Sequence, residues 1–425
     1  MINDNRRYEL SDVGERLAKH SGILELMDDL GQAINESPPR AMLGGGNPAI
    51  IPELSQVYAD RLTAILKDTS TSQPALGNYD TPAGNKQFLD EVCRYFNDKY
   101  KWEITSDNLA TSPGSQAGFF MLFNMLAGKK GDRNKHILLP LVPEYIGYTD
   151  QGLSDEMFVS CRPKINMIGQ HEFKYSVDFG ALKITKDTAA ICISRPTNPS
   201  GNVISDAEVK KLQELARANN IPLIIDNAYG LPFPGVIEES AHLPDLDGNT
   251  ILSFSLSKIG LPTARVGFFI GPETLMKYIQ SINAKINLSS PSVGQYLVAD
   301  LFKTNQLDSI RDDIIVPFYK KRAGFAWDLL HSALPDEISW RVHSYNGSYF
   351  FWLWVDGIKI TSKQLYDRLK KRGVIVVPGE YFFAGQDVDS WRHAHQCLRI
   401  NFARPENELE EGFSVLAEEL VKATT

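Results

Sequence analysis

The sequence predicts an α/β protein with a mostly parallel main sheet, followed by a smaller α+β domain. From about residue 85 to residue 270, short apolar runs alternate with amphipathic helical patterns. The runs are nearly continuous in apolar residues, which is typical of parallel strands buried on both faces. After about Asn305 a long helical pattern leads into an aromatic-rich run, which indicates a second unit. We therefore expect a large domain over residues 46–305 and a small domain formed by residues 1–45 and 306–425.

Apolar spacing predicts the helices. In residues 85–100, five apolar residues from Phe88 to Phe96 fall on one face of a helix. Two shorter helical patterns occupy residues 11–36, with a break at Ser21-Gly22. Further helices are predicted over residues 115–127, 206–219, 307–330 and 363–372, and at the C-terminus.

The strands are predicted from apolar runs bounded by turn residues or polar residues. In the large domain the predicted strands span residues 109–112, 137–141, 189–194, 221–226, 250–255 and 266–270. In the small domain they span residues 344–355, 374–377 and 398–402.

Two charged residues lie at the ends of separate strands, Asp226 after residues 221–225 and Lys258 after residues 250–255. Taken singly, Asp226 is explained as a turn cap and Lys258 as a surface lysine. The carboxyl ends of parallel strands, however, meet at one edge of the sheet, where such proteins bind ligands. Pyridoxal phosphate needs both groups: an amine that binds its aldehyde and an acid that faces its ring nitrogen.

Two loops at the same edge favour this interpretation. Asn198 lies in residues 195–202, where two prolines and a glycine fix the loop. Residues 111–116 form a strand–turn–helix pattern, and the free N–H groups at a helix start bind anions. Alone, this turn is only a good helix start. Ser255 and Arg265 add a hydroxyl and a guanidinium, so that phosphate binding becomes the favoured interpretation.

Together these motifs resemble those of the fold-type I pyridoxal-phosphate aminotransferases of the aspartate aminotransferase class. The likeness runs in order from about Gly44 to the last helix. It implies the aspartate aminotransferase-like fold, with a mostly parallel seven-stranded sheet flanked by helices and a smaller α+β domain. It also implies a transaminase with pyridoxal 5′-phosphate as its cofactor and with an amino acid and a 2-oxo acid as its substrates.

The resemblance assigns a role to each residue that matches the cofactor site. Lys258, in its Ser-x-Ser-Lys setting, matches the lysine that holds the cofactor, and Asp226 matches the acid that keeps the ring nitrogen protonated. Tyr229 and Asn198 match the partners of the ring's phenolic oxygen, and Tyr145 matches the aromatic residue that stacks on the ring. Of these, Lys258, Asp226 and Tyr229 are the expected catalytic residues. The phosphate is assigned to Gly114, Ser115, Gln116, Ser255 and Arg265.

The resemblance also implies how the substrate binds and how the chain assembles. Arg399, which alone would be explained as a surface strand arginine, matches the residue that binds the substrate α-carboxylate, helped by Gly46 and Asn198. Tyr79 matches the tyrosine that reaches the phosphate of the neighbouring subunit. A homodimer with shared active sites is therefore expected.

The sequence departs from the family's pattern at three places near the site, one of which is Thr263, where glycine is common. Lys258 and Arg265 are seven residues apart, where the family often has eight. Asn227 stands where an acidic residue often follows the aspartate. None of these changes removes a catalytic group.

Less common stretches narrow the resemblance to the branch that acts on L-valine and pyruvate; they lie in residues 20–30, 42–49, 143–148, 226–235 and 395–397. We expect an amino-acid biosynthetic enzyme that moves the amino group between L-valine, or a similar small aliphatic amino acid, and pyruvate. Its products would be 3-methyl-2-oxobutanoate and L-alanine. The alternatives are another aminotransferase or a carbon–sulfur lyase on the same scaffold, the aminotransferase-like sensory domain of a transcription regulator, and an α/β protein whose polar strand ends are only caps.

Composition argues against several other classes of function. The 425 residues carry a formal net charge of −8 and no run of Lys or Arg that would follow a nucleic acid backbone. No apolar run approaches the roughly 20 residues of a membrane span, and the first ten residues do not resemble a signal peptide. The four cysteines lack metal-ligand spacing, and no metal site is expected. We therefore expect a cytoplasmic enzyme without nucleic-acid or membrane partners.

Overall fold

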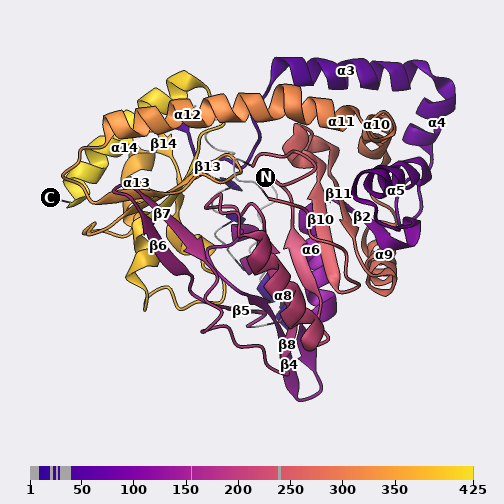
Figure 1. Ribbon diagram of the computed structural model, residues 1–425, viewed down its shortest axis with the longest axis horizontal. Helices are drawn as coiled ribbons and strands as arrows, with labels where there is room; N and C mark the ends of the chain where they lie inside the picture. The colour runs from indigo at the N-terminus through magenta and orange to yellow at the C-terminus, as the bar shows by residue number, and fades with distance from the viewer. Residues whose placement is uncertain are drawn as a thin grey trace.

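Two β-sheets lie side by side in the computed structural model, which describes residues 9–19, 23, 24, 27, 28, 40–154, 156–237 and 241–424 (Figure 1). The main sheet has eight strands. Seven follow the order β2-β11-β10-β9-β8-β4-β3, and the remaining strand, β5, also pairs with β4. Its strands are β2 (Leu109–Pro113), β3 (Gly128–Lys130), β4 (Arg133–Leu139), β5 (Phe158–Ser160), β8 (Thr188–Ser194), β9 (Leu223–Asp226), β10 (Thr250–Ser255) and β11 (Val266–Ile270).

The main sheet is mostly parallel, as the sequence predicts. Strands β5, β4, β8, β9 and β10 pair in parallel, and only β11 runs against both of its neighbours, β10 and β2. The expected number of seven strands is one too few. The eighth, β3, is a short hairpin partner of β4 that pairs with residues 133–135, before β4 meets β8.

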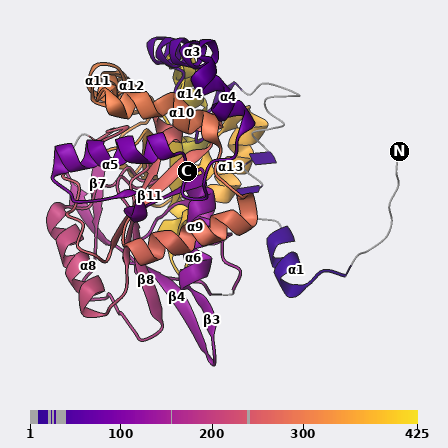
Figure 2. The same ribbon diagram turned by 90° about the vertical axis from the view of Figure 1, so that its right-hand side faces the viewer.

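Helices cover both faces of the main sheet because its side chains alternate between the faces. Phe268 packs its ring against Phe88 of α5, and its neighbour Phe269 packs against Phe119 of α6, each pair with centroids 5.6 Å apart. Figure 2 accordingly shows α5 and α8 on one side of the strands and α6 and α9 on the other. These helices are α5 (Lys86–Tyr100), α6 (Ser115–Leu126), α8 (Asp206–Ala218) and α9 (Glu273–Asn287), followed by α10 (Ser292–Lys303).

The prediction for residues 85–100 is confirmed almost to the residue. Asn85 is the N-cap of α5, and its Oδ1 accepts a hydrogen bond from the backbone N–H of Phe88 at 3.1 Å. The predicted apolar face is the buried face. The predictions for α6, α8, β8, β10 and β11 are confirmed with similar accuracy.

The second sheet has six strands in the order β15-β16-β13-β12-β7-β6. Four come from the C-terminal part: β12 (Trp340–His343), β13 (Phe350–Val355), β15 (Val377–Pro378) and β16 (Cys397–Asn401). The other two, β6 (Lys164–Ile168) and β7 (Glu172–Ser176), come from the range assigned to the large domain, and β7 pairs in parallel with β12. The domain division stays a prediction, and strand pairing crosses it at β7–β12.

A long helical segment joins the two sheets. The turn α11 (Gln306–Ser309), a π-helical stretch (Ile310–Ile315) and α12 (Val316–Ala333) follow one another with helical backbone at each junction. Figure 1 shows α12 running across the top of the molecule. Helices α13 (Ser362–Lys371) and α14 (Glu406–Thr424) lie beside the second sheet, and the short strands β1 (Ala41–Met42) and β14 (Val374–Ile375) pair in parallel.

Several sequence predictions need correction. The strand predicted over residues 344–355 begins only at Phe350, because Ser348 has a φ of +64° and Gly347 forms an isolated bridge with Ile237. The strand predicted over residues 374–377 is divided between two sheets, as β14 and β15. No helix or strand was predicted for α3 (Pro52–Lys67), α4 (Thr69–Gly77), α7 (Ile146–Thr149), α9, α10, β1, β3, β5, β6, β7 and β12.

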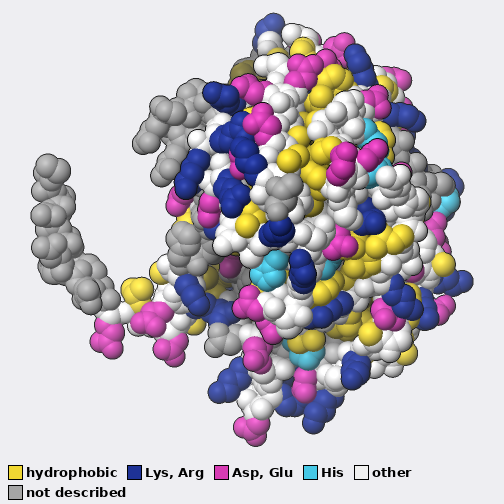
Figure 3. All heavy atoms as spheres, turned by 90° about the vertical axis from the view of Figure 1, so that its left-hand side faces the viewer, with side chains coloured by type: hydrophobic (Ala, Val, Ile, Leu, Met, Phe, Trp, Pro, Cys, Tyr) yellow, Lys and Arg dark blue, Asp and Glu magenta, His cyan; other side chains and the backbone are white. Residues whose placement is uncertain are grey.

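At the N-terminal end, α1 (Asp12–Ala18) lies at the side of the molecule (Figure 2), where the side chain of Arg16 donates to the carbonyl of Gly152. Most of the second helical pattern predicted in residues 11–36 lies outside the described residues. Within the described ranges, no helix is both long and apolar enough to cross a membrane. Figure 3 shows Lys and Arg side chains interspersed with Asp and Glu over the face that carries the second sheet.

Candidate active site

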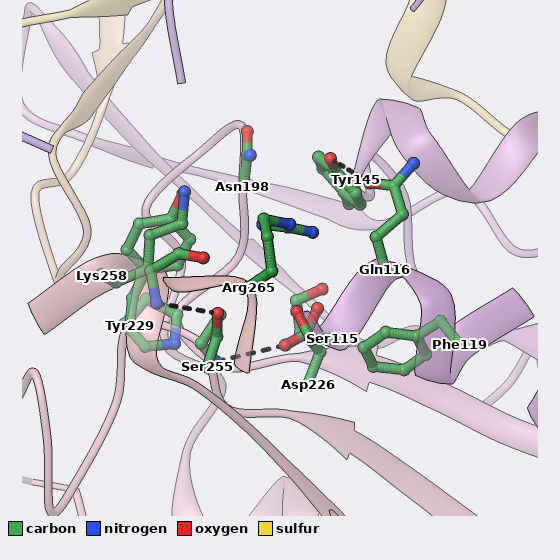
Figure 4. Close-up of a pocket in the computed structure, with 14 residues that line it drawn as sticks. Ser115, Gln116, Phe119, Tyr145, Asn198, Asp226, Tyr229, Ser255, Lys258 and Arg265 are labelled. Carbon is green, nitrogen blue, oxygen red and sulfur yellow. Dashed lines mark hydrogen bonds between the residues drawn. The ribbon is translucent and has the colours of Figure 1, made fainter. Parts of the chain in front are cut away.

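A cavity lies at the edge of the main sheet where its parallel strands end (Figure 4). Strands β8, β9 and β10 lead into the loops that carry Asn198, Asp226 and Lys258, and the antiparallel β11 begins there, just after Arg265. This is the position at which open α/β sheets bind ligands. Nine of the predicted site residues line the cavity: Ser115, Gln116, Tyr145, Asn198, Asp226, Tyr229, Ser255, Lys258 and Arg265.

Lys258 is a half-buried amine without a carboxylate partner among the described residues. Its Nζ donates to the carbonyl of Gly46 at 3.0 Å and lies 5.4 Å from the ring centroid of Tyr229. Burial lowers the pKa of Lys258 to about 8; Arg399 acts in the same direction, and Asp226 acts against it. An appreciable fraction of Lys258 is therefore uncharged near neutral pH, as a nucleophilic amine must be.

Asp226 ends β9 between Ser194 of β8 and Ser253 of β10. Its carboxylate accepts hydrogen bonds from the hydroxyl of Tyr148 at 2.8 Å and from the backbone N–H of Ala228 at 3.1 Å. Burial raises the pKa of Asp226 to about 6, and the two hydrogen bonds limit the rise. The carboxylate is thus mainly ionised at neutral pH and able to accept a hydrogen bond from a protonated ring nitrogen.

The start of α6 and Arg265 form an anion site. No side chain caps the N-terminus of α6, which leaves its first N–H groups for a ligand. The N-cap residue, Gly114, has a φ of +82°, and a Cβ at this position would lie 2.2 Å from Nη2 of Arg265. Glycine therefore allows the guanidinium to lie against the helix start. Ser115 and Ser255 line the same cavity and add two hydroxyl groups.

Two tyrosines flank the cavity (Figure 4). Tyr145 is half-buried and donates through its hydroxyl to Oε1 of Gln116 at 2.8 Å. The hydroxyl of Tyr229 is buried and has no hydrogen-bond partner among the described residues. Its neighbour Tyr349 donates to the carbonyl of Gly46 at 3.1 Å. Tyr229 is therefore ready to donate to a ligand atom.

Arg399 does not line the cavity directly, but it is hydrogen-bonded to residues at its border. Nη1 donates to Oδ1 of Asn198 at 2.8 Å, and Nη2 donates to the carbonyl of Gly44 at 2.7 Å. Its side chain packs against Phe350, only 2% of the residue is exposed, and both of its hydrogen-bond acceptors among the described residues are neutral. Burial lowers the pKa of Arg399 to about 10, so that it stays charged at neutral pH. The surface-strand explanation of Arg399 is wrong.

The glycine segment before α3 contributes three backbone acceptors to the site. The carbonyls of Gly44, Gly45 and Gly46 accept hydrogen bonds from Arg399, Asn401 and Lys258, respectively. This brings the predicted substrate residue Gly46 next to the amine of Lys258.

These groups fit pyridoxal 5′-phosphate. The buried hydroxyl of Tyr229 lacks a partner, which suits a donor to the phenolic oxygen of the ring. The α6 start with Arg265 suits the phosphate, Asp226 suits the ring nitrogen and Lys258 suits the aldehyde. Within the described residues, no group of three or more His, Cys, Asp or Glu residues could hold a metal ion.

Sequence reasoning missed three polar residues behind Asp226: Tyr148, Ser194 and Glu144. Tyr148 is buried and donates to Asp226. Ser194 lies beside Asp226 in the sheet and donates its backbone N–H to Glu144 at 2.8 Å. Glu144 and Tyr148 lie close to the predicted Tyr145 in the sequence. Their link to Asp226 through Ser194 becomes visible only in the fold, where β8 pairs with β9 and places Ser194 beside Asp226. Tyr79 lies outside the cavity and is 83% exposed.

The fold and the site define a pyridoxal-phosphate enzyme of the fold-type I class. Residues 53–416 match the family described as aminotransferase class I and II, and the chain belongs to this family. It is therefore a transaminase, and pyridoxal 5′-phosphate is its cofactor.

The chain is similar over nearly its whole length to known proteins, among them the following three. The valine–pyruvate aminotransferase of Escherichia coli (strain K12) is 43% identical over 411 residues, which cover 96% of this chain and 97% of the relative. A crystal structure of a putative amino-acid aminotransferase from Psychrobacter arcticum 273-4 superposes with a TM-score of 0.95 at 40% identity, covering 98% of this chain and 99% of that one. The crystal structure of valine–pyruvate aminotransferase from Salmonella typhimurium LT2 gives 0.86 at 41% identity, covering 95% and 99%.

The lowered pKa of Lys258 predicts how the stability of the cofactor-free protein depends on pH. In the folded protein this pKa is about 8, against an ordinary value of 10.5, so between these values the unfolded chain binds the additional proton. The contribution of Lys258 to the free energy of unfolding should therefore rise with pH across this window. Urea unfolding of the wild-type protein and of Lys258→Met as a function of pH measures it. The free energy of unfolding of the wild type minus that of Lys258→Met should rise with pH from about 8 to 10.5. A difference that does not change with pH would contradict the burial of the amine.

Proposed function

We propose that this transaminase moves the amino group between L-valine, or a similar small aliphatic amino acid, and pyruvate. The products are 3-methyl-2-oxobutanoate and L-alanine, formed in two half-reactions at one site. The likeness to the valine–pyruvate aminotransferase of Escherichia coli over 96% of the chain supports this substrate pair. One observation in the site supports an amino acid as the substrate: the guanidinium of Arg399 is buried, and among the described residues it donates to neutral acceptors and to no carboxylate.

The chain would hold the cofactor through residues from five loops. Lys258 would bind its aldehyde carbon, Asp226 would accept the hydrogen bond of its protonated ring nitrogen, and Tyr229 and Asn198 would face its phenolic oxygen. Tyr145 would stack on the ring. The phosphate would be bound by Gly114, Ser115, Gln116, Ser255 and Arg265. When bound, the cofactor supplies an electron sink that stabilises negative charge at the substrate Cα.

The substrate is oriented by charge at one end and by a base at the other. Arg399 presents two N–H groups that now donate to neutral acceptors, and a carboxylate binds such a fork bidentately. This places the substrate Cα near Nζ of Lys258, which is hydrogen-bonded to Gly46, two residues from the Arg399 partner Gly44. Nζ then takes the α-proton, and its lowered pKa near 8 suits a base at neutral pH.

The charge distribution supports a small uncharged side chain. Lys258 and Arg265 are the cations among the described residues that line the cavity, and Arg399 lies behind Asn198. All three have roles above, so this lining offers no further cation for a side-chain carboxylate. An apolar pocket separates substrates that differ by one methylene by only about 1–3 kcal/mol, so we expect overlapping use of valine, 2-aminobutyrate and alanine.

We also propose that the active enzyme is a homodimer with shared sites. Tyr79 lies in the loop before α5. In the same loop the carbonyl of Ala83 accepts a hydrogen bond from the backbone N–H of Thr111 in β2, close to the phosphate turn of the same subunit. The side chain of Tyr79 does not line that cavity and is 83% exposed. Leu62, Leu66 and Leu76 of α3 and α4 are also exposed, and a second copy would cover this apolar surface. The cytoplasmic location stays a prediction.

The proposed substrate pair predicts a single turnover without an acceptor. Added to the loaded enzyme, L-valine should bleach the visible absorption of the bound cofactor and release one equivalent of 3-methyl-2-oxobutanoate. Pyruvate should then restore the absorption and give alanine. Continuous release of ammonia without an acceptor would indicate a lyase, and a much faster response to L-aspartate than to L-valine would overturn the substrate.

Arg399→Lys tests the carboxylate site. A lysine keeps the charge but loses the bidentate fork, so kcat/KM for L-valine should fall by about 100-fold, equivalent to about 3 kcal/mol. Binding of the cofactor, measured by its absorption, should change little. Arg94→Lys, on the distant helix α5, is the matched control and should leave kcat/KM unchanged. A loss of less than about threefold in Arg399→Lys would contradict the assignment.

Mixed dimers test the role of Tyr79. Tyr79→Phe and Lys258→Ala subunits each lack one part of the proposed site, but a hybrid dimer contains one complete site if Tyr79 acts across the interface. The hybrid should therefore bind the cofactor at one site with wild-type affinity. Tyr278→Phe subunits, changed at another exposed tyrosine, serve as the control. A hybrid with only the weak affinity of Tyr79→Phe would show that Tyr79 does not act on the partner's site.

A further inference from the structure

Glu144 is a buried carboxyl group that the proposed mechanism does not use. It lies between β4 and α7, directly before Tyr145, and is only 1% exposed. Its backbone N–H donates to the carbonyl of Phe382 at 2.8 Å, which fixes the main chain. No Lys, Arg or His of the described residues forms an ion pair with it. A buried carboxylate without a cation is costly, so its contacts need an explanation.

The side chain of Glu144 accepts two hydrogen bonds from Ser194. Oε1 accepts the backbone N–H of Ser194 at 2.8 Å, and Oε2 accepts a short hydrogen bond from the Ser194 hydroxyl. Burial raises the pKa of Glu144 to about 8, and the negative charge of Asp226 adds to the rise. The titratable groups that face it are Asp226, Tyr148 and Cys192, and none is a cation. Glu144 is therefore mainly neutral at neutral pH, with a proton to donate.

A chain of hydroxyl groups leads from Glu144 to Asp226. The hydroxyls of Ser194 and Tyr148 are 3.4 Å apart, and the Tyr148 hydroxyl donates to Oδ2 of Asp226 at 2.8 Å. An ionised Glu144 accepts from the Ser194 hydroxyl, whereas a neutral Glu144 donates to it. In the second case the hydrogens of Glu144, Ser194 and Tyr148 all point in one direction, toward Asp226. Chains of this kind strengthen each of their hydrogen bonds, and a strong donor at the end favours the ionised form of the acceptor.

We propose that Glu144 is a positioning residue for Asp226, and that the two carboxyl groups share one proton through Ser194 and Tyr148. The proposal rests on the function proposed above, in which ionised Asp226 faces the ring nitrogen. When the shared proton moves, the O–H bonds of Glu144, Ser194 and Tyr148 break in turn. New O–H bonds form at Ser194, at Tyr148 and at Oδ2 of Asp226. One proton changes place, and no electrons are gained or lost. Asp226 is ionised whenever Glu144 holds the proton.

The chain offers variants that separate a neutral from an ionised Glu144. In Glu144→Gln, Oε1 can still accept from the Ser194 backbone and the amide can still donate to its hydroxyl, so this variant imitates the neutral acid. Ser194→Ala instead removes the middle link and keeps the backbone bond to Glu144. Ser205 and Glu208 form a similar pair at the start of α8, with the hydroxyl 2.8 Å from the carboxylate, and Ser205→Ala with Glu208→Gln are the matched controls.

The experiment combines infrared spectra with cofactor binding at neutral pH. The cofactor-free wild type should show the carbonyl band of a protonated carboxylic acid, which Glu144→Gln loses and Asp226→Asn retains. Glu144→Gln should bind pyridoxal 5′-phosphate within about threefold of wild type, whereas Ser194→Ala should bind it at least about tenfold more weakly, as expected for one lost hydrogen bond to a charged group. The control variants should match wild type in both measurements.

Two results would overturn the proposal. One is a wild-type spectrum in which Glu144→Gln removes no protonated-acid band, because Glu144 would then be ionised. The other is a tenfold or greater loss of cofactor affinity in Glu144→Gln with none in Ser194→Ala. Failure of the proposed function would give a different result. Asp226→Asn would then bind the cofactor as tightly as wild type, while the carbonyl band of protonated Glu144 would still be present in the wild type and absent in Glu144→Gln.

Discussion

The burial of Arg399 is the constraint on which the site depends. This guanidinium lies on β16 of the second sheet, but its two hydrogen bonds go to Asn198 at the edge of the main sheet and to Gly44 of the N-terminal segment. One side chain thus joins the three parts of the chain that surround the cavity. Both partners are neutral, so the charge is solvated without being cancelled. A carboxylate in either place would have neutralised the group and removed its attraction for a substrate.

The other two charged residues of the site, Lys258 and Asp226, also have neutral hydrogen-bond partners. Lys258 donates to a carbonyl, and Asp226 accepts from a hydroxyl and a backbone N–H. Neither of these two residues forms an ion pair with a described residue. Burial then shifts the pKa of each toward neutrality, to about 8 and about 6. The glycine segment makes this possible, because its three consecutive carbonyls approach Arg399, Asn401 and Lys258. A ligand with a carboxylate, a phosphate and a cationic ring would supply an oppositely charged partner to Arg399, Arg265 and Asp226, respectively.

Local sequence signals predicted the elements of the main sheet well. Helix α5 was predicted because five apolar residues share one face, and β10 and β11 because buried strands leave continuous apolar runs. The start of β13 was predicted too early, since the aromatic run gives no sign of the left-handed Ser348. The hairpin β6–β7 was missed because β6 is mostly exposed and β7 pairs with β12, whose residues lie 170 positions later in the chain.

The site was predicted unevenly for a similar reason. Residues that stand next to strand ends, such as Lys258 and Asp226, carry a local signal, and the family resemblance added Arg399. The burial of Arg399 had no local signal, because its partners Asn198 and Gly44 are 201 and 355 residues away. Tyr148 was missed because a buried tyrosine in the sequence looks like an ordinary core residue. Only the pairing of β8 with β9 places Ser194 beside Asp226 and makes the chain to Glu144 possible.

The attachment of the cofactor to Lys258 is the central claim, and mass spectrometry tests it most directly. The loaded protein is reduced with borohydride, which makes the bond between amine and cofactor permanent, and is then digested. We predict that the peptide containing Lys258 carries the mass of the reduced cofactor, that no other peptide does, and that Lys258→Ala yields no labelled peptide. Label on a different lysine, or a loaded wild-type protein that gives no labelled peptide, would contradict the account.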